Sequence, residues 1–290
     1  MDILRIGVVG AGLMGSGIAE ICAYAGYDTL VREVNEEFLA KGLERIEKSM
    51  QMAVQRDKLT SANLDAAHSR LRGTTQLEDF AECDLVIEAA SEDLQLKKEL
   101  FAQLDQICPP HAILTSNTSS IPIIHLAMAT RRPDHVLGMH FFNPVPTMKL
   151  IELVRTLTTS DESLETVRAV GERLGKCMIV SKDRGGFIIS YLLVPYLLDA
   201  IRMLEQGFAS KEDIDLGMML GTSYPMGPFT LLDFVGLDTT VHIADVLFEE
   251  FKEQRFAAPT LLRQMVAAGW LGCKSERGFY NYRAGERPPR

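Results

Sequence analysis

Hydrophobic positions at the start of the chain predict a buried strand, a helix and a second strand. Ile3, Ile6, Val8 and Val9 form a mostly apolar run of the kind that parallel sheets bury. After the glycine-containing segment 10–15, apolar residues recur at helical spacing, at positions 18, 19, 21, 22 and 25. A further short strand is predicted over 29–32. This order of strand, glycine turn, helix and strand is typical of the first part of a doubly wound α/β domain.

The glycine turn has the spacing of a dinucleotide-binding motif. Gly10 permits the tight turn, Gly12 lets the backbone approach a pyrophosphate, and Gly15 allows close packing of helix on strand. The free N–H groups of the helix that opens near Leu13 and Met14 would hold the pyrophosphate. We therefore predict that these five residues bind a cofactor.

The second predicted strand ends in an acid, Glu33, eighteen residues after Gly15. A carboxylate at this position can accept hydrogen bonds from an adenosine ribose and would repel a 2′-phosphate, which favours NAD. The neighbouring Arg32 could accommodate that phosphate instead, so NADP is not excluded.

A long amphipathic helix is predicted over 36–58, with apolar residues along one side. Its other side carries a basic set in an otherwise acidic protein: Lys41, Arg45, Lys48, Arg56 and Lys58. Periodicity alone favours a solvated face with Glu-to-Lys pairs. The alternative is a clamp for a phosphate-bearing substrate, such as an adenosine-phosphate tail.

Strands are next predicted over 71–74 and 85–87, followed by a helix over 94–107 and a strand over 112–115. Glu92 and Lys97 follow the second of these strands. Ligands of a doubly wound sheet bind beyond the carboxyl ends of its strands, so both residues are candidates to contact a ribose. An acid near a helix start is also an ordinary partner of the helix dipole.

Five small polar residues, Ser116 to Ser120, come directly after a buried strand. One of them would suffice to cap the helical stretch that Ile121-Pro122 begins. Five short hydrogen-bonding side chains at the carboxyl end of a strand fit better with a site for cofactor and substrate oxygens.

Two further strands, over 136–143 and 148–154, carry a histidine and an acid. A proline-containing connection joins the strands, so His140 and Glu152 can meet. Asn143 follows three residues after the histidine. Glu152 bound to one ring nitrogen would fix the tautomer and raise the basicity of the other, so the pair is a candidate base with its orienting acid.

Strand-like runs stop after residue 183, where Asp-Arg-Gly-Gly marks a boundary. A helix over 162–174 and a strand over 177–180 complete the first domain, and the rest is helical, with helices predicted over 188–206, 211–220, 238–251 and 260–268. The sequence predicts a Rossmann-like α/β domain over 1–184 and an all-α domain over 185–290.

Composition limits the functional classes. The 290 residues are 47% hydrophobic and 24% charged, which is typical of globular proteins, and the net charge of −9 argues against general nucleic-acid binding. Five scattered cysteines without a CxxC pair suggest neither disulfides nor a zinc site, and no membrane span or signal pattern is present. We expect a cytoplasmic protein that binds no metal, membrane or nucleic acid.

Several motifs in order, GAGLMGSGIA, SNTSS, HFFNPVPTMKLIELV, YPMGPFTLLDFVGLD and GFYNY, cover essentially the whole chain. Together they resemble the 3-hydroxyacyl-CoA dehydrogenases, and among them the short single-function 3-hydroxybutyryl-CoA dehydrogenases of fatty acid metabolism. The resemblance implies reversible hydride transfer between NAD and the (S)-3-hydroxyl carbon of an acyl-CoA, and a homodimer.

The resemblance also implies roles for individual residues. His140 would take the hydroxyl proton, Glu152 would orient the histidine ring, and Ser119 would hydrogen-bond the substrate oxygen. Asn143 would lie by the nicotinamide and the substrate. The family's other cofactor contacts fall on Glu33, Glu92, Lys97, Ser119 and Lys274, and its substrate contacts fall on Ser49, Arg56 and Ser119.

The sequence departs from the family pattern at three positions. Ser190 stands where the family usually has an asparagine that helps to hold the thioester carbonyl, and Tyr191 follows it instead of a basic residue. Glu33 replaces the usual aspartate. Two alternatives remain: a related dehydrogenase of a free hydroxy acid, and a dinucleotide-binding protein without turnover.

Overall fold

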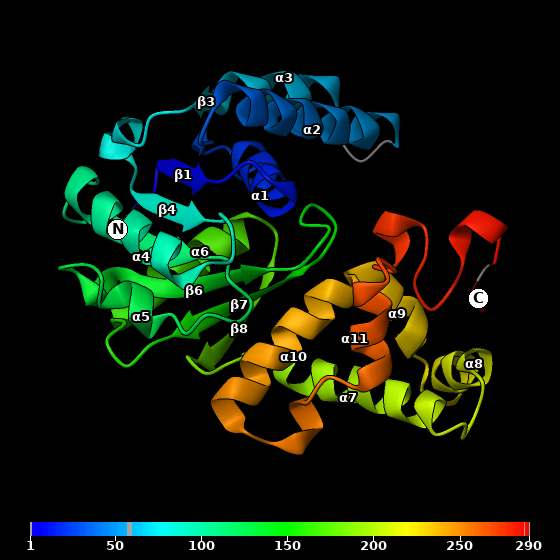
Figure 1. Ribbon diagram of the computed structural model, residues 1–290. Coiled ribbons are helices and arrows are strands. Elements are labelled where there is room, and N and C mark those ends of the chain that lie inside the picture. The colour runs from blue at the N-terminus through cyan, green and yellow to red at the C-terminus, as the bar shows by residue number, and fades with distance from the viewer. Residues whose placement is uncertain (1, 57–59, 287, 290) are drawn as a thin grey trace. The chain divides into compact units, whose positions relative to one another are not determined.

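The computed structural model describes residues 2–56, 60–286 and 288–289, and the chain divides into two compact units, 1–184 and 185–290 (Figure 1). The first is an α/β unit and the second is helical. The predicted fold class is therefore confirmed.

The first unit is built on one sheet, which has eight strands among the described residues, in the order β3-β2-β1-β4-β5-β6-β7-β8. The strands are β1 (Arg5–Val9), β2 (Asp28–Arg32), β3 (Leu71–Thr74), β4 (Leu85–Glu88), β5 (Ile113–Ser116), β6 (Val136–Phe141), β7 (Leu150–Arg155) and β8 (Cys177–Lys182). Strands β1 to β6 are mutually parallel, so their carboxyl ends meet at one edge. Ligands of such sheets bind at this edge.

Strands β6 and β7 pair in the antiparallel sense because the short connection 142–149 joins them without a helical crossover. In their register His140 lies directly opposite Glu152. The predicted meeting of these two residues is thus set by strand pairing.

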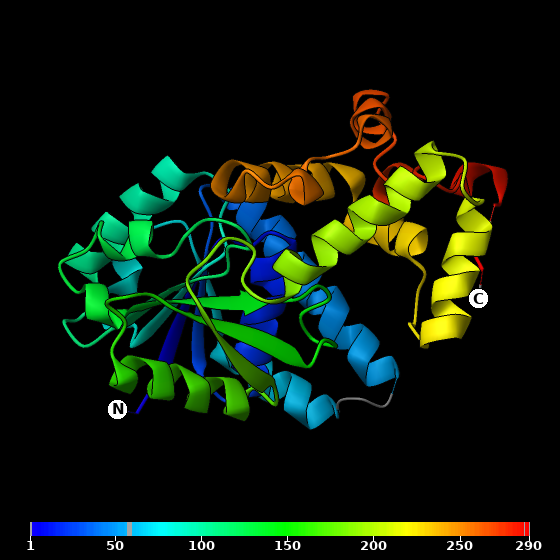
Figure 2. The same cartoon turned by 90° about the horizontal axis from the view of Figure 1, so that it is seen from below.

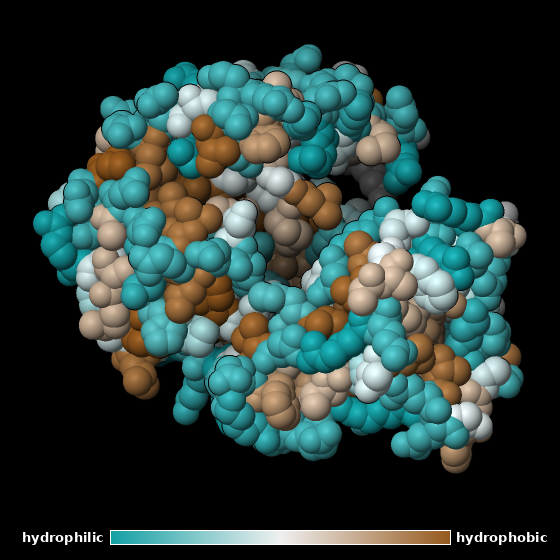
Figure 3. All heavy atoms as spheres, viewed as in Figure 1, coloured by the Kyte–Doolittle hydropathy of each residue, from teal (hydrophilic) through white to brown (hydrophobic). Residues whose placement is uncertain are grey.

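Helices cover both faces of the sheet (Figures 1 and 2). They are α1 (Leu13–Tyr24), α2 (Glu36–Gln55), α3 (Ser61–Arg70), α4 (Leu94–Ile107), α5 (Ile124–Ala127) and α6 (Asp161–Arg173), with short 3₁₀ turns at Glu78–Glu82 and Pro133–His135. Apolar residues of α1, α2 and α6 share one hydrophobic cluster with the strands. Hydrophilic side chains cover the outer surface of α2 and α3 (Figure 3).

The second unit contains α7 (Ile189–Glu205), α8 (Lys211–Thr222), α9 (Pro228–Val235), α10 (Leu237–Phe251) and α11 (Thr260–Ala267), with 3₁₀ turns at Gln254–Phe256, Cys273–Ser275 and Tyr282–Ala284. Its core includes Leu198, Phe229, Leu247 and Tyr280, each almost fully buried. The side chain of Asp233 accepts hydrogen bonds from the backbone N–H groups of Phe279 and Tyr280, which fastens the GFYNY segment to α9.

The sequence analysis missed two helices. Helix α9 begins at Pro228, directly after Gly227, and this Gly-Pro pair is typical of a break between helices, although proline is also favoured at the first position of a helix. Helix α3 carries few apolar residues, so its periodicity is weak. The long helix was predicted to reach Lys58, but α2 ends at Gln55, and Lys58 lies outside the described residues.

In the described part of the chain, no helix is long and apolar enough to cross a membrane, and no group of three or more metal-ligating side chains gathers. The five cysteines are free thiols.

Candidate active site

The glycine turn connects β1 to α1, and each of its three glycines has the geometry that the sequence motif predicts for it. Gly10 has φ +99°, and a side chain there would meet the Ala89 carbonyl oxygen at 2.6 Å. At Gly15 a side chain would lie only 1.8 Å from the Gly10 carbonyl oxygen, so this residue lets the helix pack against the turn. At Gly12 a side chain would meet no described atom within 4 Å. The backbone at Gly12 is therefore open to a ligand.

Gly12 is also the N-cap of α1 and supplies no side chain to bond the first helical N–H groups. The first turn contains no acid, while Leu13 is largely exposed and Met14 is partly exposed. An open helix N-terminus of this kind attracts an anion. The turn therefore fits the pyrophosphate of a dinucleotide.

Glu33 follows β2 and its carboxylate lies against the glycine turn. Its Oε1 accepts a hydrogen bond of 2.8 Å from the N–H of Ala11, and its Oε2 accepts one of 3.0 Å from Val34. The adjacent Arg32 donates from Nε to the carbonyl oxygen of Thr75 at 3.3 Å. The backbone carbonyl of Arg32 accepts a hydrogen bond of 2.8 Å from the N–H of Gly10, but Glu33 is the member of this pair whose side chain bonds to the turn.

Helix α2 packs on the same turn, a contact that the sequence analysis did not foresee. A side chain at Gly42 would lie 2.4 Å from the Cβ of Ala11, so only glycine allows this approach. Arg45 donates from Nη1 to the Ala11 carbonyl oxygen at 2.9 Å and to Ser16 Oγ at 3.1 Å. Part of the basic set therefore supports the turn, while Lys41 and Lys48 form exposed pairs with glutamates one helical turn earlier.

Lys97 and Glu92 belong to a buried polar network at the carboxyl ends of β4 and β5. Lys97 is 1% exposed, and its Nζ lies 2.6 Å from Glu88 Oε1 and 3.3 Å from Glu92 Oε2. Burial raises the pKa of Glu92, but Lys97 and two hydroxyl groups outweigh this, and the pKa lies below its ordinary value. Lys97 therefore supports the wall of the site in this structure, beneath Glu92, which remains partly exposed.

The Ser116–Ser120 segment alternates between this network and the surface of the site. Ser116 donates to Glu88 at 2.6 Å, and Thr118 and Ser120 donate to Glu92. All three are buried, whereas Asn117 and Ser119 between them are partly exposed. The three buried residues therefore make structural hydrogen bonds, as the cap interpretation predicts. Ser119 is one of the two partly exposed residues that can contact a ligand, as the site interpretation predicts.

His140 and Glu152 form a buried pair at the ends of β6 and β7. Nδ1 of His140 lies 2.8 Å from Oε2 of Glu152, and the two side chains are 8% and 0% exposed. The Asn117 Oδ1 accepts a hydrogen bond of 2.8 Å from the N–H of Phe141, which joins the polar segment to the strand of His140. Asn143 follows in the exposed connection between the strands.

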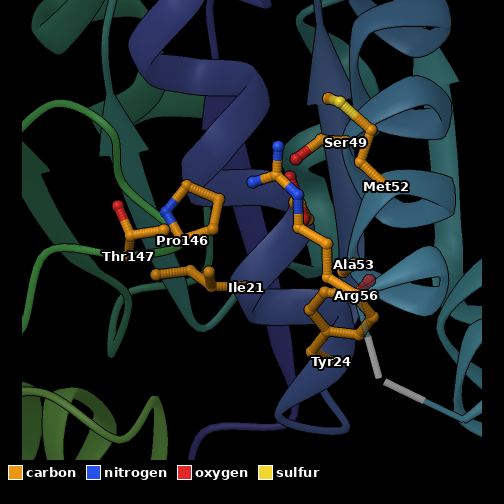
Figure 4. A pocket seen from close by; sticks show the side chains of 9 residues that line it. Ile21, Tyr24, Ser49, Met52, Ala53, Arg56, Pro146 and Thr147 are labelled. Atoms are coloured by element: carbon orange, nitrogen blue, oxygen red, sulfur yellow. The ribbon is translucent and has the colours of Figure 1, made fainter. Parts of the chain in front are cut away.

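Ser49 of α2 and Arg56, the C-cap residue of that helix, project into a pocket of about 470 Å³ beside α1 (Figure 4). The other lining residues are Glu20, Ile21, Tyr24, Met52, Ala53, Pro146 and Thr147. The sequence analysis did not single out Glu20, which lies on the pocket floor and is 2% exposed. An acid within the apolar run of the first helix was the available signal.

The two remaining predicted site residues lie in the second unit. Ser190 is buried in the first turn of α7. The Nζ of Lys274 lies 2.6 Å from Asp238 in an exposed ion pair. Their predicted contacts with substrate and cofactor remain predictions.

Comparisons with known proteins show the family to which this chain belongs. The model of the 3-hydroxyacyl-CoA dehydrogenase NAD-binding domain matches residues 5–184, and that of the family's C-terminal domain matches residues 186–282. A 3-hydroxybutyryl-CoA dehydrogenase of Mycobacterium tuberculosis is 52% identical over 97% of this chain and 99% of its own.

Solved structures are equally similar. The crystal structure of FadB2 from M. tuberculosis superposes with a TM-score of 0.96 at 51% identity, over 97% of this chain and all of that one. The (S)-3-hydroxybutyryl-CoA dehydrogenase of Ralstonia eutropha gives 0.93 at 42% identity, over 97% and 99%. These findings confirm the resemblance seen in the sequence. The chain belongs to the 3-hydroxyacyl-CoA dehydrogenase family and is an NAD-dependent enzyme.

Proposed function

We propose that the protein catalyses the reversible oxidation of short-chain (S)-3-hydroxyacyl-CoA, such as 3-hydroxybutyryl-CoA, to the 3-ketoacyl-CoA. The observation that carries the proposal is the buried His140–Glu152 pair at the carboxyl edge of a dinucleotide-binding sheet. The names of the relatives from M. tuberculosis and R. eutropha support the short chain length.

His140 acts as the base in this proposal. The hydrogen bond from Nδ1 to Glu152 leaves the neutral ring with its lone pair on Nε2, the nitrogen that takes the substrate hydroxyl proton. Glu152 then stabilises the imidazolium that forms, as the acid of a serine-protease triad does. Bound NAD supplies the hydride acceptor.

Ser119 and Asn143 complete the catalytic set. Ser119 is a partly exposed hydroxyl at the end of β5, and it donates a hydrogen bond to the oxygen at C3, where charge develops as the proton leaves. Asn143 lies in the connection that follows β6, and its amide contacts nicotinamide and substrate. Ser190 contributes a hydroxyl for the thioester carbonyl in place of the amide usual in the family.

The pocket beside α1 binds the nucleotide part of CoA. Arg56 supplies a cation and Ser49 a hydroxyl donor for a phosphate group, while Ile21, Met52 and Pro146 provide apolar contacts. Arg56 is thus the member of the basic set for which we favour the role of a phosphate clamp. A dehydrogenase of free hydroxy acids would not need such a pocket, so the pocket favours an acyl-CoA substrate over a free hydroxy acid.

We infer that the enzyme is a homodimer through its helical unit. Leu216 and Leu220 are exposed by 40% and 75% on one side of α8, and Phe208 is 76% exposed nearby in the sequence. Apolar side chains gathered in this way indicate a protein interface. Leu220→Glu is expected to give monomers in light scattering, whereas Leu157→Glu, at a still more exposed leucine of the first unit, leaves the mass of a dimer. A wild-type monomer would contradict the inference.

A cytoplasmic location remains a prediction.

The test of the function is the oxidation of NADH and NADPH with acetoacetyl-CoA or free acetoacetate. We expect turnover of the CoA ester with NADH preferred. Turnover of free acetoacetate at comparable kcat/KM would favour the hydroxy-acid alternative. Tight NADH binding without turnover of either compound would favour a non-catalytic dinucleotide-binding protein.

A further inference from the structure

Glu20 is a buried carboxyl group on the floor of the pocket that holds Ser49 and Arg56. It lies near the middle of α1, within an otherwise apolar face, and is 2% exposed. The hydroxyl of Ser49 on α2 donates a hydrogen bond to its carboxylate. The proposed function gives Glu20 no role, yet the residue engages the hydroxyl that we assign to the substrate phosphate.

Ionisable groups of three chain segments lie around this carboxyl. Lys176, before β8, attracts it from a position where its Nζ donates to the carbonyl oxygens of Val145 and Met148 at 2.6 and 2.7 Å. Tyr24 lies one turn further along α1, and its buried hydroxyl has no hydrogen-bond partner among the described residues. The C-cap residue of α2, Arg56, lines the same pocket, whereas Glu47 of α2 does not line it and pairs with His68 of α3 at 2.6 Å.

The proton on Glu20 controls what Ser49 can offer to a ligand. When Glu20 is ionised, it holds the Ser49 proton and adds a negative charge to the pocket. When Glu20 is neutral, its own O–H can donate to Ser49 Oγ, and the serine proton is then available for a phosphate oxygen. A phosphate brought next to an ionised Glu20 would meet the like charge of a buried carboxylate, which weakens its binding.

We propose that Glu20 makes the binding of acyl-CoA proton-linked, so that the pocket binds the substrate's phosphate more tightly when Glu20 is neutral than when Glu20 is ionised. This inference rests on the proposed function, because it assumes that the pocket holds the nucleotide of CoA. Glu20 acts here as a specificity residue for phosphorylated substrates and takes no part in hydride transfer.

The titration falls in a useful range. Burial raises the pKa of Glu20 to about 7, against the opposing effects of the Ser49 hydrogen bond and the Lys176 charge. If a bound phosphate raises this pKa by about one further unit, KM for the CoA ester rises about fivefold between pH 6 and pH 8 and approaches a tenfold limit. The direction is weaker binding at higher pH.

The experiment compares KM at several pH values for acetoacetyl-CoA and for acetoacetyl-pantetheine, which lacks the nucleotide. In the wild type we expect KM of the CoA ester to rise as stated. KM of the pantetheine ester should show only the pH dependence that both esters share, without this additional rise. In Glu20→Gln the additional rise with the CoA ester disappears. Glu47→Gln is the matched control, because it removes an acid from the neighbouring helix and keeps the wild-type profile.

Two results would overturn the proposal: the same rise of KM in Glu20→Gln as in the wild type, or an equal rise with the pantetheine ester. The phosphate of CoA also titrates near pH 6, but that effect is common to all the proteins and cancels between them. Absence of turnover with acetoacetyl-CoA at every pH would contradict the proposed function instead.

A second measurement does not depend on the variant's folding. Calorimetry of CoA binding to the wild type at pH 7, in two buffers of different ionisation enthalpy, gives the number of protons exchanged. We expect net proton uptake, because bound phosphate raises the pKa of Glu20. Titration of the ligand's own phosphate acts in the opposite direction, since its binding to cations releases protons. Zero exchange or net release would contradict the proposal.

Discussion

Both units of the molecule bury carboxylates, but they satisfy them differently. In the α/β unit, Glu88 and Glu152 bond mainly to side chains with movable protons, namely a lysine, a serine and a histidine. In the helical unit, Asp215 and Asp233 receive two backbone N–H groups each, in addition to hydroxyl groups. Burial of an acid therefore does not by itself indicate a functional site.

The donors explain the difference. A backbone N–H cannot leave its acceptor without distorting the chain, so it serves to fix one segment against another. A histidine or hydroxyl group can pass or re-aim a proton while the backbone stays in place. The first arrangement suits a structural clamp and the second suits chemistry, and each can be tested by removing one partner.

The largest expected effect is that of His140→Ala on turnover. Loss of the base should lower kcat about 10²- to 10⁴-fold, because general-base catalysis contributes on that scale. Binding of NADH, measured by its fluorescence, should persist because the glycine turn is untouched. His125→Ala, at an exposed histidine of α5, serves as the control and keeps full activity. Intact turnover in His140→Ala would contradict the mechanism.

Asp233→Ala should act on stability. It leaves the N–H groups of Phe279 and Tyr280 and the hydroxyl of Tyr282 without their acceptor, at a cost of about 4 kcal/mol in the free energy of unfolding. Denaturant unfolding followed by circular dichroism measures it. The control Asp245→Ala breaks an exposed pair with Arg263 in the same unit and should cost less than about 1 kcal/mol. Equal losses in the two variants would contradict the assignment of Asp233 as a clamp.

Glu20 affects stability as a structural clamp does, although it lines the proposed substrate pocket. A buried acid with a pKa of about 7 makes the free energy of unfolding depend on pH. Its folded-state pKa lies above the unfolded value, so its contribution to stability is full below about pH 4.5 and is lost as the pH rises through 7. The loss is about 3 kcal/mol. Glu20→Gln should flatten this part of the stability curve relative to Glu47→Gln. Parallel curves for the two variants would contradict the burial of a neutral Glu20.

The sequence carried enough information to predict the strands of the α/β unit, because buried parallel strands are continuous apolar runs bounded by glycine and polar residues. It also paired His140 with Glu152, since two strands joined by a short connection must meet. These are consequences of local pattern and of register.

The partners of Lys97 could not be predicted in the same way. A lysine at the start of a helix usually points to solvent, and only the packing of α4 against the sheet buries this one between Glu88 and Glu92. Glu20 escaped notice for a related reason, because its burial depends on α2, which packs over α1 and approaches the preceding turn closely at Gly42. Long-range packing decides which polar residues become part of a site.

The smallest predicted effect concerns Glu33 and sharpens the distinction between clamp and site. Its carboxylate bonds to the N–H of Ala11 and thus resembles a clamp, but it lies at the turn where the adenosine ribose of NAD would bind. Glu33→Gln keeps an oxygen for Ala11 and removes the charge that repels a 2′-phosphate. The preference for NADH over NADPH, measured as the ratio of kcat/KM values, should fall about tenfold, which corresponds to about 1.4 kcal/mol, with little change in stability. Glu36→Gln, three residues away at the start of α2, is the matched control and should keep the wild-type ratio. A loss of stability in Glu33→Gln without a change in cofactor preference would show that Glu33 acts only as a clamp, and selection against NADPH would then have to come from elsewhere at the turn.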